Sequence, residues 1–242
     1  MLRHRNLTAN RKDTKTLHMR RWKHRFFCTM NANTSTTVYF VRHGQTAANA
    51  GSIIQGHTDV PLDELGLKQA NTVAGRLKDF PFDAIYSSDL SRASVTAEKI
   101  AGSRPVITTE QLREWHLGHW QGKSLEEIKT IFKEEYQWYL TDDPEFTVVD
   151  GESSLEFAER AKNFMKETAD KHPGQNVLCV SHGGFMTKVF KNALQVESLP
   201  HRPRIFNTAI CCFRTIDRGE TWQLVFWNDA SHLTNGALDN LG

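Results

Sequence analysis

The sequence has 242 residues, of which 39% are hydrophobic, and its 30 lysines and arginines against 28 acids give a formal net charge of +2. This composition is typical of a globular chain and excludes both a disordered polyelectrolyte and a fibrous repeat. No apolar run approaches the roughly 18 residues of a membrane-spanning helix, so we expect none. The 4 cysteines show neither a disulfide framework nor metal-ligand spacing, which favours reduced thiols in an intracellular protein.

Basic charge is concentrated at the N-terminus. Residues 1–29 carry nine lysines and arginines and one acid, a net +8, so residues 30–242 carry −6. An acidic body argues against nucleic-acid binding. Residues 1–36 are a basic extension without a repeated apolar period, which we expect to be disordered and exclude from the fold.

Alternative interpretations of this extension stay open. An Arg-rich, acid-poor segment suits an organelle transit peptide, whereas a translation start at Met30 would remove most of it. An RNA-binding arm is a third, less favoured interpretation. We therefore expect a cytoplasmic protein, with a plastid or mitochondrion as the alternative if the extension is a transit peptide.

Beyond the extension, strand and helix patterns alternate. Residues 37–41 form a β-branched and aromatic run typical of a buried strand. Ser124 with Glu127, and Ser153 with Glu156, are capping boxes that open helices. In chain order, the patterns predict a strand at 37–41, a helix at 63–79, a strand at 83–87, a helix at 90–101, a strand at 105–108, a helix at 125–140, a helix beginning at 153, a strand at 176–181, a helix at 185–194, and a hairpin of 209–215 with 221–227.

This alternation predicts an α/β fold, a three-layer sandwich with a mainly parallel central sheet, helices on both faces and an antiparallel C-terminal hairpin at one edge. We expect one domain over residues 37–242, with a helical cap at about 112–150. In such sheets, ligands bind beyond the carboxyl ends of the parallel strands. The residues after Val41, Ser87 and Ser181 are therefore the first candidates for a functional site.

Two histidines and two arginines follow these strands. Arg42 and His43 follow the first, Arg92 lies just beyond the second, and His182 follows the third. Each histidine is followed by a glycine, which lets the backbone turn tightly and approach a ligand. Alone, each of these side chains would more often be structural or solvated. Together they form a compact cationic pocket that suits a multiply charged oxyanion, with phosphate the first candidate.

An ordered set of short motifs accompanies these residues between about 37 and 236. Its members are Arg42-His43-Gly44-Gln45-Thr46, Asn49, Gln55-Gly56, Asp59, Pro61-Leu62, Gly66, Gln69-Ala70, Ser87-Ser88-Asp89-Leu90, Arg92-Ala93, Thr96-Ala97, Leu112-Arg113-Glu114, Gly118, Trp120, Gly122, Gly151-Glu152-Ser153 and Val180-Ser181-His182-Gly183-Gly184. In content and order, the set resembles the histidine phosphatase superfamily, also called phosphoglycerate mutase-like.

The resemblance implies a phosphohistidine mechanism. His43 would be the nucleophile, and the charges of Arg42 and Arg92 should lower its pKa and keep it unprotonated. Arg42, Arg92 and His182 would hold the phosphoryl oxygens. Glu114 occupies the position of the family's proton donor and acceptor.

The resemblance also implies a set of substrate-binding residues: Asn49, Thr46, Gln55, Gly56 and Gly183. Asp89 is a less favoured alternative to Glu114, because it precedes a helix and can cap it. We expect neither a metal nor another cofactor. His116 and His119 are spaced as a possible ligand pair, but no third ligand accompanies them.

Three functions stay open, and a phosphatase that hydrolyses a small phosphorylated metabolite is favoured. Residues 112–122 resemble the phosphatase form of the family, although Gln121 replaces a glutamate often found there. Residues 123–150 carry eight acids against three lysines, which suits poorly the bisphosphate of a cofactor-dependent phosphoglycerate mutase, the alternative. An inactive phospholigand-binding scaffold is the second alternative, and it is disfavoured because every implied catalytic residue is present.

The last expectations concern binding partners, the aromatic side chains of the cap, and two arginines near the C-terminus. We expect a monomer or homodimer that acts on a small phosphorylated metabolite and binds neither nucleic acid nor membrane. The aromatic side chains of the cap should mainly pack against the sheet domain rather than contact the substrate. Arg202 and Arg204 either reach a second anion of the substrate or lie in a surface loop.

Overall fold

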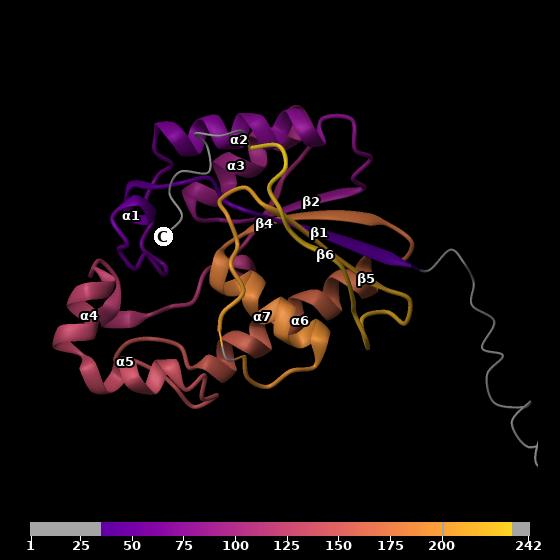
Figure 1. Ribbon diagram of the computed structural model, residues 1–242. Helices are drawn as coiled ribbons and strands as arrows, with labels where there is room; N and C mark the ends of the chain where they lie inside the picture. The colour runs from indigo at the N-terminus through magenta and orange to yellow at the C-terminus, as the bar shows by residue number, and fades with distance from the viewer. Residues whose placement is uncertain (1–34, 200, 234–242) are drawn as a thin grey trace, which may run out of the picture. The chain divides into compact units, whose positions relative to one another are not determined.

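The computed structural model describes residues 35–199 and 201–233, and within them the chain forms a six-stranded sheet in the order β3-β2-β4-β1-β5-β6 (Figure 1). The strands are β1 (Thr36–Arg42), β2 (Ala84–Ser88), β3 (Ile107–Thr109), β4 (Asn176–Ser181), β5 (Ile210–Thr215) and β6 (Gln223–Asp229). The first four in chain order pair in parallel, and β5 and β6 add an antiparallel hairpin at the β1 side. The predicted α/β sandwich with a C-terminal hairpin is confirmed.

Helices alternate with the strands along the chain. They are α1 (Ala47–Ala50), α2 (Glu64–Leu77), α3 (Ser91–Ala101), α4 (Leu125–Ile131), α5 (Lys133–Leu140), α6 (Ser154–Lys171) and α7 (Gly183–Leu194), with 3₁₀ turns η1 (Glu110–Leu112) and η2 (Gly118–Trp120). The two capping boxes predicted from the sequence begin α4 and α6, where each serine side chain accepts a hydrogen bond from the backbone N–H three residues on.

Side-chain alternation along β1 determines which helices cover each face of the sheet. Val38 and Phe40 join the larger core cluster, and the Phe40 ring lies 6.0 Å from that of Phe185 in α7. Val41 joins a second cluster with Val73 of α2 and with residues of α3. Figure 1 shows α2 and α3 on one side of the sheet and α6 and α7 on the other. β1 and β4 are therefore covered on both faces.

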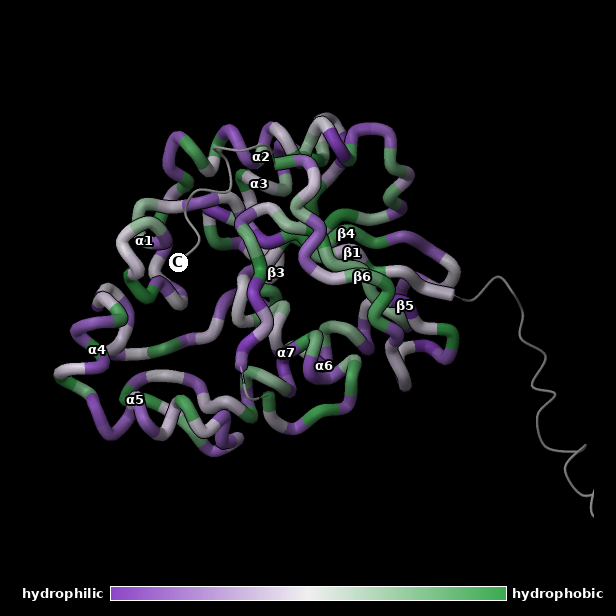
Figure 2. Tube along the Cα trace, in the orientation of Figure 1, coloured by the Kyte–Doolittle hydropathy of each residue, from purple (hydrophilic) through white to green (hydrophobic). Residues whose placement is uncertain are grey.

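The segment around α4 and α5 adds aromatic side chains to the larger core. Figure 2 shows hydrophilic residues alternating with hydrophobic ones along both helices. Trp115, Trp120 and Phe146 are buried, and the Trp115 ring centroid lies 5.4 Å from that of Phe157 in α6. Trp138 is the most exposed of the cap tryptophans, at 37%. These contacts support the expectation that the cap aromatics mainly pack.

The single helix predicted over 125–140 is wrong, because the structure breaks it at Phe132 into α4 and α5. Phe132 has φ −114° and ψ 46°, outside the helical region, and its ring lies 4.7 Å from that of His119. No proline or glycine interrupts the segment, so tertiary packing overrides helix propensity here. The break redirects α5 so that Tyr136 and Tyr139 also reach the core.

Other boundaries differ by smaller amounts. The strand predicted at 105–108 is found at β3, which begins two residues later. Pro105, which has no backbone N–H to donate to a neighbouring strand, therefore lies outside it. Thr36 already belongs to β1, so the sheet begins one residue earlier than expected. The rest of the predicted extension, residues 1–34, lies outside the described residues.

The described part of the chain bears on the predictions about membrane-spanning helices and cysteines. None of its helices combines the length and the apolar character needed to cross a bilayer. Cys179, Cys211 and Cys212 are buried free thiols, and Cys28 lies outside the described residues.

Candidate active site

Three neighbouring strands carry the candidate site. Because β2, β4 and β1 are adjacent and parallel, their carboxyl ends meet at one edge of the sheet. Arg42 at the end of β1 pairs with Ser181 at the end of β4, so His43 and His182 occupy equivalent positions on adjacent strands. Their ring centroids are 5.1 Å apart. Arg92, in the first turn of α3, follows β2, and the structure thus brings the four predicted residues together.

The hydrogen bonds of the two histidines assign them opposite tautomers. The Nδ1 atom of His43 lies 2.7 Å from the carbonyl oxygen of Gly44, which can only accept, so Nδ1 carries the proton and Nε2 presents a lone pair. The Nδ1 atom of His182 accepts a hydrogen bond from Nε of Arg92 at 3.2 Å, so its proton lies on Nε2. Among the described residues, that Nε2 is buried without a hydrogen-bond partner. One ring therefore presents a lone pair at Nε2, and the other presents a proton at Nε2.

Two guanidinium groups give the site its charge. Arg92 is fully buried, and its two terminal nitrogens donate to the carbonyl oxygens of Thr58 at 2.8 Å and Gly56 at 2.7 Å. Nη1 of Arg42 donates to the carbonyl oxygen of Ile205 at 2.7 Å. Its Nε is buried and has no partner within the described segments. Because the partners are neutral carbonyl groups, both arginines keep their positive charge for an anion.

Burial and these two cations set the protonation of the histidines. The pKa of His43 is lowered well below its ordinary value of 6.5, first by burial and then by Arg92 and Arg42. Burial followed by Arg92 lowers the pKa of His182 in the same way. Burial also lowers the pKa of Arg92 to about 10, which leaves it protonated at neutral pH. The sequence predicted an uncharged imidazole for His43 from the charges of the two arginines, and the structure adds burial as the larger cause.

Glu114 faces the same site from the loop after η1. Its Oε2 accepts a hydrogen bond from the backbone N–H of Gly184 at 3.0 Å, and its Oε1 accepts one from that of Trp115 at 2.9 Å. A Cβ atom on Gly184 would lie 2.2 Å from Oε1, so any larger residue there would displace the carboxyl group from this position. The Glu114 charge also acts on Arg42 and Arg92, which places it beside both cations.

Asp89, the alternative acid, has a different role. Nε and Nη2 of Arg113 donate to its two carboxylate oxygens at 2.8 and 2.5 Å. This fork lowers the pKa of Asp89 below its ordinary value. A carboxylate held ionised in this way is a poor proton donor, which argues against Asp89 as the acid.

Most of the predicted substrate-binding side chains hold the loop after β1. Thr46 and Asn49 form a capping box at the start of α1, and the Thr46 hydroxyl donates to Oε1 of Gln55 at 3.0 Å. Gly56 contributes its carbonyl group to Arg92. Their observed contacts therefore shape the loop and orient the arginine.

Close backbone approaches fix the loop after β1. A Cβ on Gly44 would lie 2.5 Å from the carbonyl oxygen of Gly66, and a Cβ on Gly66 would lie 2.0 Å from that of Gln45. The start of α2 is thus pressed directly against the residue that follows His43 in the chain. Gly183, at the start of α7, lies beside Arg42, whose Nε would be 3.5 Å from an added Cβ.

Arg160 is a site residue that the sequence did not reveal. Its Nη1 donates to the carbonyl oxygens of Gln111 at 2.9 Å and Arg113 at 2.7 Å, and its Nη2 donates to that of Glu114 at 3.0 Å. It also forms an ion pair with Glu152 at 2.5 Å. One side chain of α6 therefore fixes the loop that carries the acid. The only sequence signal was the motif around Glu152, whose partner cannot be read from spacing.

Asn207 and Gln121 connect further segments to the site. Nδ2 of Asn207 donates to the carbonyl oxygen of His43 at 2.9 Å and approaches Oδ1 of Asn49 at 3.5 Å. Gln121, the departure from the family pattern, accepts a hydrogen bond from the backbone N–H of His57 at 2.6 Å. It thereby links the cap to the loop that carries the partners of Arg92.

The two histidines considered as metal ligands have separate partners. The His116 ring packs edge-to-face against that of His57 with centroids 4.6 Å apart, and Nε2 of His57 is 2.8 Å from the carbonyl oxygen of Glu114. His119 lies 3.0 Å from Glu135. In residues 35–199 and 201–233, no group of three or more His, Cys, Asp or Glu side chains is arranged to hold a metal ion.

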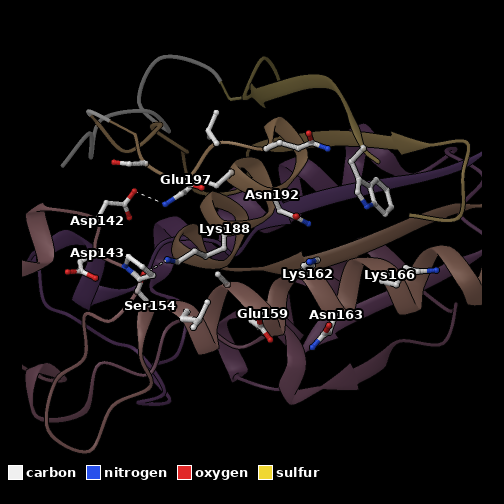
Figure 3. A pocket seen from close by; sticks show the side chains of 18 of the residues that line it. Asp142, Asp143, Ser154, Glu159, Lys162, Asn163, Lys166, Lys188, Asn192 and Glu197 are labelled. Carbon is white, nitrogen blue, oxygen red and sulfur yellow. Dashed lines mark hydrogen bonds and ion pairs between the residues drawn. The ribbon is translucent and has the colours of Figure 1, made fainter. Parts of the chain in front are cut away.

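A groove of about 1120 Å³ lies between α6 and α7 rather than at the strand ends (Figure 3). Asp142, Lys188 and Asn192 are among its lining residues. Within the described residues, none of the candidate catalytic side chains lines it. The groove is therefore a separate feature from the site of the histidines.

Comparison with known proteins now identifies the family. The model of the histidine phosphatase superfamily (branch 1) matches residues 38–230. The chain belongs to the histidine phosphatase superfamily.

Other members of the superfamily match most of the chain. A "phosphoglycerate mutase-like protein 4" of Arabidopsis thaliana is 37% identical over 201 residues, 81% of this chain and 86% of that protein. A "metal-independent phosphoserine phosphatase" of the same organism is 34% identical over 205 residues, 83% of this chain and 84% of that protein. The crystal structure of a phosphoserine phosphatase of Entamoeba histolytica in complex with 3-phosphoglyceric acid has a TM-score of 0.74 and 31% identity, covering 82% of this chain and all of that one.

Proposed function

We propose that this histidine phosphatase hydrolyses small phosphomonoesters through a phosphohistidine on His43, with Glu114 as the proton donor and acceptor. Its superfamily and its phosphatase relatives place it among the phosphomonoester hydrolases. The assignment of roles rests on the opposite tautomers of the two buried histidines. His43 presents a lone pair at Nε2 and His182 a proton at Nε2, and the two ring centroids are 5.1 Å apart.

In the first step, Nε2 of His43 attacks phosphorus and the bond from phosphorus to the ester oxygen breaks. The leaving oxygen takes a proton from the Glu114 carboxyl group. Positive charge develops on the imidazole, and the Gly44 carbonyl oxygen that accepts from Nδ1 stabilises it. Arg42 Nε and His182 Nε2 are two buried donors without protein partners in the described segments, and they suit the equatorial oxygens of the transferring group.

In the second step, a water molecule replaces the alcohol. The Glu114 carboxylate takes a proton from this water as its oxygen attacks phosphorus, and the bond between nitrogen and phosphorus breaks. Phosphate leaves, and His43 and Glu114 return to their starting protonation states. The acid is fixed for both steps by two backbone N–H groups rather than by a flexible side chain.

The nucleophile is tested by trapping the phosphoenzyme. The reaction is not quenched with acid. Protein mixed with a ³²P-labelled monoester is instead denatured in alkali, in which phosphohistidine survives. We expect label on the wild type and on His201→Ala, an exposed histidine outside the site. We expect neither label nor phosphate release from His43→Ala. Normal turnover by that variant would refute the assignment.

The acid is tested by leaving-group dependence. We expect Glu114→Gln to lose on the order of 10²–10⁴ in rate on alkyl phosphates. The loss on p-nitrophenyl phosphate should be much smaller, because that leaving group needs little protonation. Equal losses on both substrate types would count against a proton-transfer role.

Mutase activity is the alternative that the relatives' names keep open. It is distinguished by assaying 2- and 3-phosphoglycerate interconversion, with a bisphosphate primer, beside phosphate release from a panel that includes phosphoserine. We expect phosphate release to dominate. Binding without turnover of any ester would instead indicate an inactive scaffold.

A further inference from the structure

A segment that we call the strap, residues 202–208, links α5 to the loop after β1 by hydrogen bonds. At one end, Arg202 donates a hydrogen bond to the hydroxyl group of Tyr139 in α5. Further along, the Ile205 carbonyl oxygen accepts from Arg42 at 2.7 Å, and Asn207 donates to the His43 carbonyl oxygen. Figure 1 shows this segment, in light orange, running from the level of α5 up to the sheet. Residues of the strap therefore border the reaction site.

Arg202 presents an unneutralised charge on the strap. Its Cζ lies 3.9 Å from the ring centroid of Tyr139 and 5.6 Å from that of Trp115, so the guanidinium plane rests on an aromatic surface. Among the described residues it has no carboxylate within ion-pair distance, and the nearby Asp142 is instead paired with Lys191 at 2.6 Å. One of its five N–H groups donates to the Tyr139 hydroxyl, and the others are available to an anion.

The aromatic surface under Arg202 is also the support of the catalytic acid. The backbone N–H of Trp115 holds Oε1 of Glu114 at 2.9 Å, and the charges of both Arg202 and Glu114 act on Tyr139. The ester oxygen must reach Glu114 to receive its proton. An ester oxygen that reaches Glu114 therefore meets a carboxyl group bonded to the backbone of Trp115, whose ring lies 5.6 Å from Cζ of Arg202.

A second cation reinforces the positive potential at this place. Lys188 of α7 is buried, its Nζ lies 4.9 Å from the Trp115 ring centroid, and it donates to the Ser154 hydroxyl at 2.6 Å (Figure 3). Burial lowers the pKa of Lys188 to about 8, with the positive charge of Lys191 as the next cause. Two cations thus flank the Trp115 ring beside the acid, and neither is paired with a carboxylate in the described part of the chain.

We propose that Arg202, resting on Tyr139 and Trp115, is a specificity-determining residue that binds an anionic group, such as a carboxylate, on the leaving group. The preferred substrates are then phosphomonoesters of hydroxy acids rather than of neutral alcohols. A planar guanidinium group suits a carboxylate, which it can hold by two parallel hydrogen bonds. This inference rests on the proposed phosphatase function and names the substrate class of that same site.

The test compares two esters that differ only in the anion, 3-phosphoglycerate and glycerol 3-phosphate. We expect the wild type to favour 3-phosphoglycerate. In Arg202→Gln, kcat/KM for 3-phosphoglycerate should fall roughly 10- to 100-fold, mainly through KM, because a charge-assisted hydrogen bond is lost. For glycerol 3-phosphate it should stay within about twofold, because that ester offers no anion to this arginine.

Arg204→Gln is the matched control, because Arg204 lies on the same strap but stacks on Phe206, at 5.4 Å. We expect it to keep the preference of the wild type. An equal loss in both variants would overturn the assignment to Arg202, and so would an equal loss on both esters or an unchanged preference in Arg202→Gln. Circular dichroism melting curves show whether Arg202→Gln is folded. If it is not, Arg202→Lys, which keeps the charge, must restore more than half of the preference for 3-phosphoglycerate over glycerol 3-phosphate. Failure of the phosphatase function itself is distinguishable, because the wild type would then hydrolyse neither ester.

Discussion

Replacing Arg160 by methionine tests whether the position of Glu114 depends on a side chain from α6. The guanidinium group donates to three backbone carbonyl oxygens at 2.7–3.0 Å and pairs with Glu152, and both members of the ion pair are only 19% exposed. Methionine keeps the apolar stem against Phe157, which now lies 4.8 Å from Cζ, but removes every donor. A hydrogen bond from a charged donor is worth about 1.5–3 kcal/mol, and partial exposure reduces each value.

We therefore expect the free energy of unfolding to fall by about 2–4 kcal/mol, because the Glu152 carboxylate also loses its partner. The catalytic effect is separate from this loss. A shift of about 1 Å in the loop would cost on the order of 10² in rate where Glu114 transfers the proton. On p-nitrophenyl phosphate we expect less than about a threefold loss, because that leaving group departs without a proton.

The assay is a set of aryl and alkyl phosphates that spans leaving-group pKa, measured below the melting temperature of each variant. Arg160→Met should give a steeper dependence of kcat/KM on leaving-group pKa than the wild type. Arg160→Lys keeps the charge but not the planar fork and should lie between them. Lys162→Met, an exposed change on the same helix, is the control and should leave the slope unchanged. A uniform loss across the set would mean that Arg160 serves stability alone.

Three further predictions follow from the site. Removing the Arg42 charge in Arg42→Gln should raise the pKa of His43, so the acid limb of the kcat/KM profile should move to higher pH; an unmoved limb would contradict the charge coupling. Gly184→Ala should displace Glu114, since the added Cβ would lie 2.2 Å from Oε1, and cost about tenfold or more on alkyl phosphates in steady-state assays; full activity would be incompatible with that contact. Because the pKa of His43 and that of His182 are lower in the folded chain than the ordinary 6.5, the unfolded chain binds more protons below that pH, and stability is lost as pH falls from 6.5 by up to about 1.4 kcal/mol per pH unit for each ring. Urea unfolding between pH 7.5 and 5 should show this loss of stability with falling pH, and the loss should be smaller in His43→Gln by the contribution of one ring. If wild type and His43→Gln lost stability equally, the buried-histidine explanation would be excluded.

The sequence predicted the parts of the site that depend on local pattern. Buried strands have continuous β-branched and aromatic runs, so the ends of β1 and β4, and with them His43 and His182, could be located to within a residue. Their placement side by side needed only the rule that parallel strands end at one edge. The order of motifs then indicated the acid, Glu114, which no periodicity marks.

Contacts between distant segments could not be predicted in this way. Arg160 looks like any polar residue on an amphipathic helix, because its carbonyl partners are backbone atoms that leave no trace in residue identity. Asn207 lies in a segment without regular structure, 164 residues from His43 in the chain. Phe132 ends a helix although its neighbours favour one, because the break is decided by the packing of the cap.

The location of His43 next to the middle of the sheet has a dynamic consequence. β1 is hydrogen-bonded on both sides, to β4 and to β5, whereas β3 and β6 form the edges. Amide protons of the central pair should exchange with solvent deuterium only through global unfolding, while those of α4, α5 and the edge strands exchange through local openings. Fluctuations of α4 and α5 can therefore occur while the strand that leads to His43 stays fixed.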